Sequence, residues 1–442
     1  MRWQRELIPL LANLKLAVVL LLVIALASVT GTVIEQGEPP SFYEANYPLK
    51  PALFGFITYK FILATGLNQV YSSWWFLGLL IVFGSSLLSC TVYRQIPLVK
   101  VARRWHFYTK PSAILKLPIS YTIPQISLTG LAEQLRSRGY QVFMSESQNQ
   151  LYARKGLIGR IAPIVVHFSI VIILAGAIWG AVAGFTTQAM IPSGTTAKLN
   201  IPHRNWKLQV HKFWIDYTPS GAIDQFYSDL SLLDENDREL TRKTIFVNEP
   251  LRYQGVTFYQ ASWNISAIRF RLNQSPIFQL PLQKLEAKGK GNQVWGTWLP
   301  TQPDLSAGIT LVTPDLQGTF VIYDQAGKIL TSMHTGETKE INGINLSLLE
   351  VIGDTGLQIK ADPSIPLVYT GFALLMASVI ASYLSHSQVW ALAESGNIYL
   401  GAKTNRSQVV FSAEMARICE HLSNMVPESN NSPASPEFIS QN

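Results

Sequence analysis

The chain has 442 residues, of which 48% are hydrophobic and only 14% are charged, and its formal net charge is +7. About a quarter of the residues of a typical soluble protein are charged. This composition therefore argues against an ordinary soluble protein and predicts membrane spans separated by soluble segments. The two cysteines, Cys90 and Cys419, lie far apart without metal-type spacing, which excludes a disulfide framework and a zinc cluster.

Four segments are long and apolar enough to cross a bilayer as helices, which takes about 20 residues each. They cover residues 14–33, 74–92, 161–183 and 366–384. The first segment has an alternative, because Ala25–Ala27 resembles the cleavage site of a signal peptide. The apolar run continues beyond that site to Ile34, so we expect a retained span.

Basic residues predict the orientation of the spans, because Lys and Arg near span ends favour the cytoplasmic side. The loop 93–160 has eleven Lys and Arg residues against two acidic ones, whereas residues 185–364 have 16 against 17. We therefore expect the basic loop and both termini inside. The inside segments are 1–13, 93–160 and 385–442, and the outside segments are 34–73 and 184–365.

The outside block 184–365 contains short alternating runs such as "WKLQVHKFWIDY" and "VTFYQASW", separated by Asn, Gly, Asp and Pro. This pattern is typical of an antiparallel all-β domain, either a sandwich or barrel-like. The predicted fold class is thus an integral membrane protein with four transmembrane helices, a large extracytoplasmic all-β domain and a small α+β cytoplasmic domain.

Two inside segments are expected to build the small α+β domain together, because neither buries a core alone. The basic loop 93–160 contains an amphipathic helix that begins after Ser127 or Thr129 and ends at Gly139, followed by a hairpin. The segment 385–425 reads as a hairpin plus a helix. The last residues, 426–442, are polar and rich in Pro, Ser and Asn, which predicts disorder.

Common catalytic motifs are missing from the sequence: it has no Walker loop, GxGxxG, GxSxG, HExxH or CxxC. Neither cysteine lies in the outside block, so the chain carries no thiol–disulfide chemistry of its own there. Scattered Asp and Glu residues neither identify nor exclude a catalytic carboxylate pair. The residues alone favour a binding or assembly protein, with a membrane-anchored enzyme or sensor as a further alternative.

The third span, within "VVHFSIVIILAGAIWG", carries His167. Ionisable groups inside a bilayer are costly and indicate function, although a neutral imidazole also suits a packing hydrogen bond. Gly176, Gly180 and Gly184 form a GxxxGxxxG ridge for close helix packing. Nine residues at about 100° each put Gly176 opposite His167. If the ridge packs within this protein, His167 faces a partner or a ligand.

The other histidines give weaker indications of a functional role. Two are expected in solvent on the inside, His106 and His421. Three lie in the outside block without ligand spacing, His203, His211 and His334. His386 directly follows the fourth span at the inner interface and is a second candidate for binding a cofactor.

The stretch "IFVNEPLRYQGVTFYQASW", Ile245 to Trp263, resembles the signature of the ResB (CcsB) family of System II cytochrome c biogenesis proteins. The residues that carry the resemblance are Asn248, Pro250, Leu251, Tyr253, Gly255, Tyr259, Gln260 and Trp263. The first, third and fourth spans also resemble those of the family, in the four-span form of its cyanobacterial and plastid branch. Turns at Asn-Glu-Pro and Tyr-Gln-Gly and buried aromatic rings are an alternative, purely structural explanation of the stretch.

The resemblance implies a cytochrome c biogenesis factor that, with the multi-span protein CcsA, transfers haem across the membrane and supports its attachment to apocytochrome c. It implies that His167 is an axial ligand of a b-type haem in transit, shared with CcsA, and it implies no other metal. Expected partners are CcsA, apocytochrome c, thiol-reducing proteins of the pathway and membrane lipid, but not nucleic acid. The expected location is the thylakoid or plasma membrane.

The tryptophan-rich motif of CcsA is absent here, since Trp74–Trp75 is only a tryptophan pair. The chain is therefore expected to be non-catalytic alone or one subunit of a cytochrome c haem lyase complex. An alternative stays open, namely a scaffold that binds no haem, stabilises CcsA and holds apocytochrome c.

Overall fold

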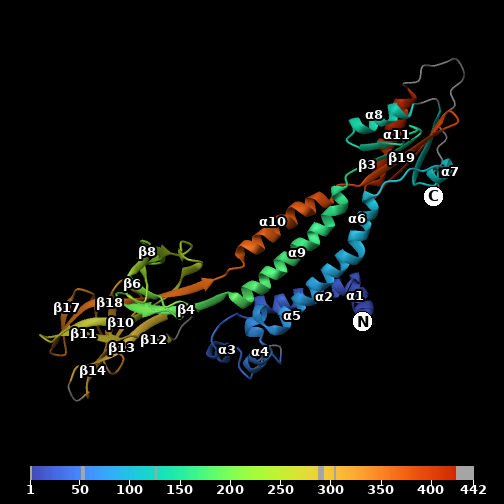
Figure 1. The fold of residues 1–442 in the computed structure, drawn as a ribbon. Helices are drawn as coiled ribbons and strands as arrows, with labels where there is room; N and C mark the ends of the chain where they lie inside the picture. The colour runs from blue at the N-terminus through green and yellow to red at the C-terminus, as the bar shows by residue number, and fades with distance from the viewer. Residues whose placement is uncertain (1, 51–54, 125–126, 287–292, 303–304, 425–442) are drawn as a thin grey trace. The chain divides into compact units, whose positions relative to one another are not determined.

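The computed structural model describes residues 2–50, 55–124, 127–286, 293–302 and 305–424. The predicted disordered segment 426–442 lies outside the described residues. The chain divides into two compact units (Figure 1). The first comprises Met1–Val182 with Ser364–Asn442, and the second comprises Ala183–Pro363.

Among the described residues, four helical runs of the first unit are long and apolar enough to cross a membrane. They contain helices α2 (Leu14–Val33), α5 (Trp74–Cys90), α9 (Ile158–Ala183) and α10 (Ile365–Ser382). The second run is longer than the predicted 74–92, because the chain stays helical through the π-helical segment η2 (Thr91–Gln95) and α6 (Ile96–Arg103). Helix α9 begins three residues before the predicted start of its span.

Glycines let α9 and α10 pack closely, and Figure 1 shows the two helices side by side. A Cβ atom built on Gly176 of α9 would lie 2.6 Å from Val368 Cγ2 of α10, and one built on Gly371 would lie 2.6 Å from Ile173 Cγ1. Such small residues let helix backbones approach where side chains could not fit. On another side of α9, Leu174 packs with buried side chains of α2 and α5, among them Leu20 and Phe83.

Short helices precede and connect the first two spans. They are α1 (Arg2–Leu11), α3 (Pro40–Asn46), α4 (Tyr59–Thr65) and the 3-10 helix η1 (Leu67–Ser72). The last three enclose a small core that includes Tyr43 and Ile62. The Tyr47 hydroxyl donates to Glu35 Oε2 at 2.7 Å, and this hydrogen bond lowers the pKa of Glu35. The described residues of the segment 34–73 therefore form short helices around a small core of their own.

The structure contains the predicted small α+β domain, built from residues of 93–160 and 385–425 together. Its elements are α7 (Pro111–Ile114), β1 (Ile119–Pro124), α8 (Leu128–Ser137), β2 (Gln141–Met144), β3 (Gln150–Lys155), β19 (Ser387–Glu394), β20 (Asn397–Thr404) and α11 (Gln408–Ser423). The described strands form one antiparallel sheet in the order β1-β20-β19-β3-β2, so the C-terminal hairpin β19–β20 lies between β1 and β3. Helices α8 and α11 close the core through residues such as Leu131 and Met415. The Ser127 side chain caps α8 by accepting from Gly130 N at 3.2 Å.

The second unit is the predicted antiparallel β domain, and its described strands form three sheets. The first is β5 (Thr196–Lys198), β6 (Lys207–Tyr217), β7 (Ile223–Leu233) and β8 (Glu239–Phe246). The second is β4 (Phe185–Pro192), β9 (Leu251–Tyr253), β10 (Val256–Leu272), β11 (Phe278–Pro281), β17 (Thr338–Ile341) and β18 (Ile344–Ala361). The third is β12 (Gln283–Glu286), β13 (Gln293–Pro300), β14 (Gly308–Thr313), β15 (Thr319–Tyr323) and β16 (Ile329–His334).

The long antiparallel pair β10–β18 contributes to two separate hydrophobic cores. The end of the pair near Phe258 and Ile359 packs against the β5–β8 sheet, and we call this part lobe A. The end near Phe270 and Leu346 packs against the β12–β16 sheet, and we call this part lobe B. The β domain is thus two layered lobes that share one strand pair, rather than a single sandwich or barrel.

Candidate functional site

His167 lies on α9, nine residues after the helix begins at Ile158, and its side chain contacts the η2 segment. Its Nδ1 atom is 3.0 Å from Thr91 Oγ1, and its Nε2 atom is 3.2 Å from Gln95 Nε2. The two partners are four residues apart on one run of helix, so both side chains reach the same imidazole. The ring is half-buried within this chain.

The partners of His167 determine its tautomer. The Gln95 amide nitrogen can only donate, so His167 Nε2 must accept and carries the lone pair. The Nδ1 atom then carries the proton and donates it to Thr91 Oγ1. The Thr91 hydroxyl is free to accept, because its own proton is directed at the Leu87 carbonyl, 2.9 Å away. The imidazole is therefore neutral, with Nε2 as its ligand-type nitrogen.

The glycine ridge on α9 lies against a different neighbour. Gly176 contacts Val368 and Leu367 of α10, while His167 contacts η2. Gly180 is half-buried within α9, and Gly184 lies between the end of α9 and the start of β4. The ridge thus packs within the protein at Gly176, and His167 has hydrogen-bond partners within the same chain.

His386 is enclosed where α10 leads into the small α+β domain, and it is only 3% exposed. Its Nδ1 atom lies 3.2 Å from the Lys155 carbonyl, an acceptor, so Nδ1 carries the proton. Its Nε2 atom is buried with no hydrogen-bond partner among the described residues. Burial lowers the pKa of His386, and the positive charges of Arg160 and Arg154 lower it further. His386 is therefore a neutral imidazole whose free nitrogen faces the protein interior.

The signature stretch Ile245–Trp263 forms turns and core of the β domain. Asn248 has a positive φ of 70° in the turn between β8 and β9. Gln254 and Gly255 both have positive φ in the two-residue turn between β9 and β10, as a type I′ hairpin turn requires. Two other signature residues surround these turns, Pro250 and Leu251, and Leu251 is buried.

The signature aromatic and amide residues differ in exposure. Tyr253 packs edge-on against Trp206, with ring centroids 5.4 Å apart, whereas Tyr259 is 36% exposed. Trp263 packs against the cores of both lobes and lies 5.2 Å from the Trp295 ring. Gln260 is buried and makes hydrogen bonds with Ser228 and Thr355. Most of the signature therefore supports the fold, and Tyr259 is its surface-exposed ring.

Comparison with known proteins identifies the family of this chain. The model of the ResB-like family matches residues 14–306 and 277–416. This chain belongs to the ResB-like family. A protein of Thermosynechococcus vestitus named cytochrome c biogenesis protein CcsB is 55% identical over 428 residues, covering 95% of this chain and 96% of its own. A protein of the same name from Trichormus variabilis is 52% identical over 439 residues, covering 97% and 95%.

A solved structure named cytochrome c haem lyase CcmF also matches, with 11% identity over 78% of this chain and 44% of its own. Its TM-score is 0.24, and a score this low does not show a shared fold.

A polar hollow of about 600 Å³ opens on lobe A of this ResB-like protein. It is lined by residues that include His203, Arg204 and Gln254. The Arg204 guanidinium lies 4.3 Å from the Trp206 ring centroid and donates to Gln254, so the strongest cation of the hollow already has partners. None of the eight signature residues lines the hollow.

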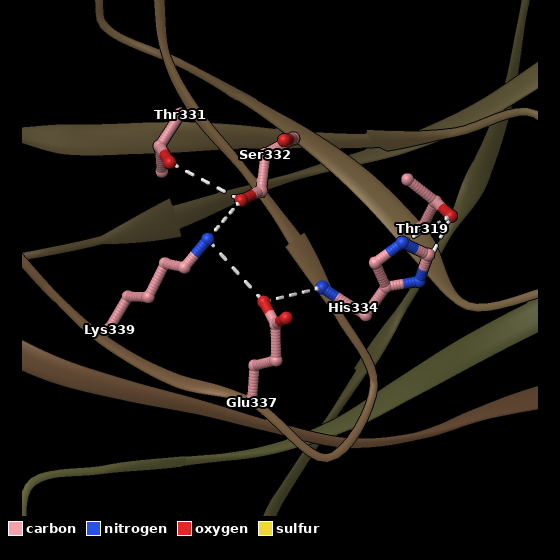
Figure 2. A network of polar contacts seen from close by, with 6 residues as sticks. All are labelled: Thr319, Thr331, Ser332, His334, Glu337 and Lys339. Carbon is pink, nitrogen blue, oxygen red and sulfur yellow. Dashed lines mark hydrogen bonds and ion pairs between the residues drawn. The ribbon is translucent and has the colours of Figure 1, made fainter.

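An edge of lobe B is covered by the protein's own side chains. Strand β16 is an edge strand of its sheet, and Figure 2 shows Thr331, Ser332 and His334 of this strand with the side chains that they contact. Lys339 Nζ donates to the Ser332 carbonyl at 2.7 Å, and the His334 amide donates to Glu337 Oε2 at 3.0 Å. An extended peptide that added to this edge would have to displace both contacts.

Sequence reasoning missed Thr91 and Gln95, the two partners of His167. It placed the end of the second span at Val92, just inside η2, and did not connect that end with His167. The available signal was two polar residues four apart where an apolar run ends. The helix that these two residues face depends on how α5 and α9 pack. The sequence alone does not reveal this packing.

Proposed function

We propose that this chain is a cytochrome c biogenesis factor that, together with CcsA, transfers haem across the membrane and supports its attachment to apocytochrome c. His167 supplies one axial ligand to the haem iron, and a histidine of CcsA supplies the other. The observation that carries the proposal is a neutral, oriented imidazole inside a membrane helix, in a chain of the ResB-like family.

The donor set at His167 fits haem. Neutral imidazole is a common axial ligand of haem iron, and ligand histidines usually donate their other N–H to a neighbouring oxygen. His167 has this arrangement, with Nδ1–H directed at Thr91 Oγ1. The ring is half-buried within the chain, so part of it is open to a neighbouring protein. We propose that CcsA covers that part and shares the b-type haem.

The orientation we propose has both termini and the small α+β domain inside, and the β domain outside. Eleven basic residues in the loop 93–160 support it. The shared core of the small domain supports placing the loop 93–160 and the C-terminal segment on the same side of the membrane. Residues before α9 and residues after α10 can form one core only if they lie on the same side. The membrane is a thylakoid or plasma membrane.

We propose that the β domain holds apocytochrome c while other proteins keep its thiols reduced. The exposed signature ring, Tyr259, supports contact with a partner on lobe A. The outer edge of β16 is the less suitable place, because Lys339 and Glu337 occupy its backbone groups.

His386 is the second histidine that we propose for contact with haem. Its tautomer suits a ligand, since Nδ1–H is directed at the Lys155 carbonyl and Nε2 is free. Its Nε2 atom is enclosed, however, so ligation requires the end of α10 to move. His167 needs no such movement and ranks first.

The test is the absorption spectrum of the chain purified with CcsA, as wild type and as His167→Ala. We expect the Soret band to vanish or shift in the variant, and added imidazole to restore it. His386→Ala is the parallel variant, and it measures whether a second histidine of this chain contributes.

One observation favours a second function, a scaffold that binds no haem, stabilises CcsA and holds apocytochrome c. Both ring nitrogens of His167 already have hydrogen-bond partners within the chain, as a packing residue would. An unchanged haem spectrum in His167→Ala, with CcsA still bound, would select this scaffold.

A further inference from the structure

Three side chains from two spanning helical runs form a directed chain of hydrogen bonds. The Thr91 hydroxyl donates to the Leu87 carbonyl, His167 Nδ1–H donates to Thr91 Oγ1, and Gln95 Nε2–H donates to His167 Nε2. The Gln95 amide oxygen lies 3.5 Å from Thr91 Oγ1, so the nearer Leu87 carbonyl, at 2.9 Å, is the main acceptor of the Thr91 hydroxyl proton. Reversing the His167 tautomer would put two N–H groups against each other at Gln95 and leave Thr91 with one proton for two acceptors.

Thr91 and Gln95 act on opposite nitrogens of the ring, and therefore act in opposite senses on any metal ligation. Thr91 fixes the proton on Nδ1, which leaves the lone pair on Nε2 and orients the ring. Gln95 donates to that lone pair, so a metal can use Nε2 only after the Gln95 amide has moved away. Thr91 thus prepares Nε2 for binding a metal, whereas Gln95 occupies the same nitrogen.

The backbone around these residues is unusual in a way that fits a special role. Residues Thr91–Gln95 form a π-helical turn, with the Ile96 amide donating to the Thr91 carbonyl five residues earlier. Such single turns inside α-helices often mark functional sites. Here the wide turn carries both partners of His167, one at each end.

We propose that Thr91 is a positioning residue that holds His167 in the Nδ1–H tautomer, and that Gln95 is a displaceable cap on the iron-binding nitrogen. This inference rests on the proposed haem-ligand role of His167. In the absence of haem, Gln95 satisfies the lone pair of an imidazole that would otherwise be unpaired inside the membrane. Gln95 would release Nε2, which would then hold the haem iron, while Thr91 would keep its hydrogen bond with Nδ1–H.

The experiment uses the full chain purified with CcsA and measures haem affinity by titration of the Soret band. Thr91→Val removes the hydroxyl at constant shape, and we expect affinity to fall about tenfold, the usual lower range for losing such a partner of a metal ligand. Thr91→Ser keeps the hydroxyl and should restore it. Gln95→Leu removes the competing donor, and we expect affinity to rise about fivefold, the factor for one ordinary hydrogen bond.

A second readout needs no haem. Nitrogen NMR of the haem-free full chain with labelled histidine, assigned by His167→Ala, reports which ring nitrogen carries the proton. We expect the Nδ1–H form in wild type, Thr91→Ser and Gln95→Leu, and a shift toward the Nε2–H form in Thr91→Val. Ser86→Ala is the matched control, because Ser86 is a buried hydroxyl on α5 that bonds to the Leu11 carbonyl instead.

The outcomes separate this inference from the proposed function. If His167→Ala leaves haem binding unchanged, the ligand role fails and the inference fails with it. If His167→Ala abolishes haem binding, but Thr91→Val and Gln95→Leu both match Ser86→Ala in affinity and tautomer, the ligand role stands and the inference is overturned. Affinity changes of opposite sign for the two variants support it, because a general loss of packing would lower affinity in both.

Discussion

Gly176 of α9 lies directly against Val368 of α10. A Cβ atom on Gly176 would lie 2.6 Å from Val368 Cγ2, which is nearer than two carbon atoms approach without a bond between them. The helix that presents His167 to η2 is therefore held on its other side by a contact that only glycine permits. Helix packing and the candidate ligand site share the same rigid element.

Replacing Gly176 by alanine should loosen this contact. Overpacking of a close interface typically costs about 1–3 kcal/mol, so we expect Gly176→Ala to lower the thermal unfolding temperature of the chain in detergent. Gly78→Ala is the matched control within a span, because nothing lies within 4 Å of a Cβ atom built there. Equal unfolding temperatures for the two variants would contradict the packing argument.

Much of the fold could be predicted from the sequence, because its signals are local. Apolar runs marked four spanning helices, alternation marked the β domain, and Ser127 and Gly139 marked the ends of α8. Strand pairing was beyond reach, because it is not local. The sharing of β10 and β18 by two lobes depends on strands far apart in the chain.

Gln260 should be a structural residue, although it belongs to the signature stretch. Its side chain is buried against the Ser228 and Thr355 hydroxyls. Gln260→Leu would leave both hydroxyls without this partner, which costs about 1–3 kcal/mol. We expect faster proteolysis of the β domain in that variant, measured on the full chain in detergent.

Its neighbour Tyr259 offers the contrasting case. Because Tyr259 is 36% exposed, Tyr259→Ala should change stability by only about 0.5 kcal/mol or less. If this stable variant fails to bind apocytochrome c in a pull-down with the full chain, Tyr259 is part of the partner surface. Rapid proteolysis of Tyr259→Ala would instead show that the exposed ring supports the fold.

The candidate site was predictable only in part, and the reason is geometric. His167 stands out as an imidazole in an apolar run, and His386 stands out by its place after the last span. Thr91 and Gln95 look like ordinary polar residues at a span end. Their importance comes from the packing of α5 and its continuation η2 beside α9, which brings residues 72 and 76 positions apart into contact.

His386 should make the stability of the small α+β domain depend on pH. Burial lowers the pKa of His386 in the folded chain below its ordinary value of 6.5, so the unfolded chain binds a proton more readily. The free energy of unfolding should therefore be constant well above pH 6.5 and decrease as the pH falls below it, by at most about 1.4 kcal/mol per pH unit.

His386→Gln should remove this dependence, as measured by unfolding of the full chain from about pH 5 to about pH 7.5. His421→Gln is the matched control, since His421 lies exposed on α11 of the same domain. If the unfolding free energy of both His386→Gln and the control keeps the wild-type dependence on pH, groups other than His386 cause that dependence.

The small α+β domain should fail to form without the C-terminal segment. Strand β3 pairs with β19, and β1 pairs with β20, so a chain that ends at Ser385 removes a neighbour from each. Leu131 and Leu135 of α8 would also lose the packing of α11. We expect residues 119–155 to become sensitive to protease in membranes that hold this shortened chain. A chain that ends at Asn424 keeps all the described core residues and should stay protected. Equal protection of residues 119–155 in both chains would mean that the loop folds alone, and the joint core would then be unnecessary for its stability.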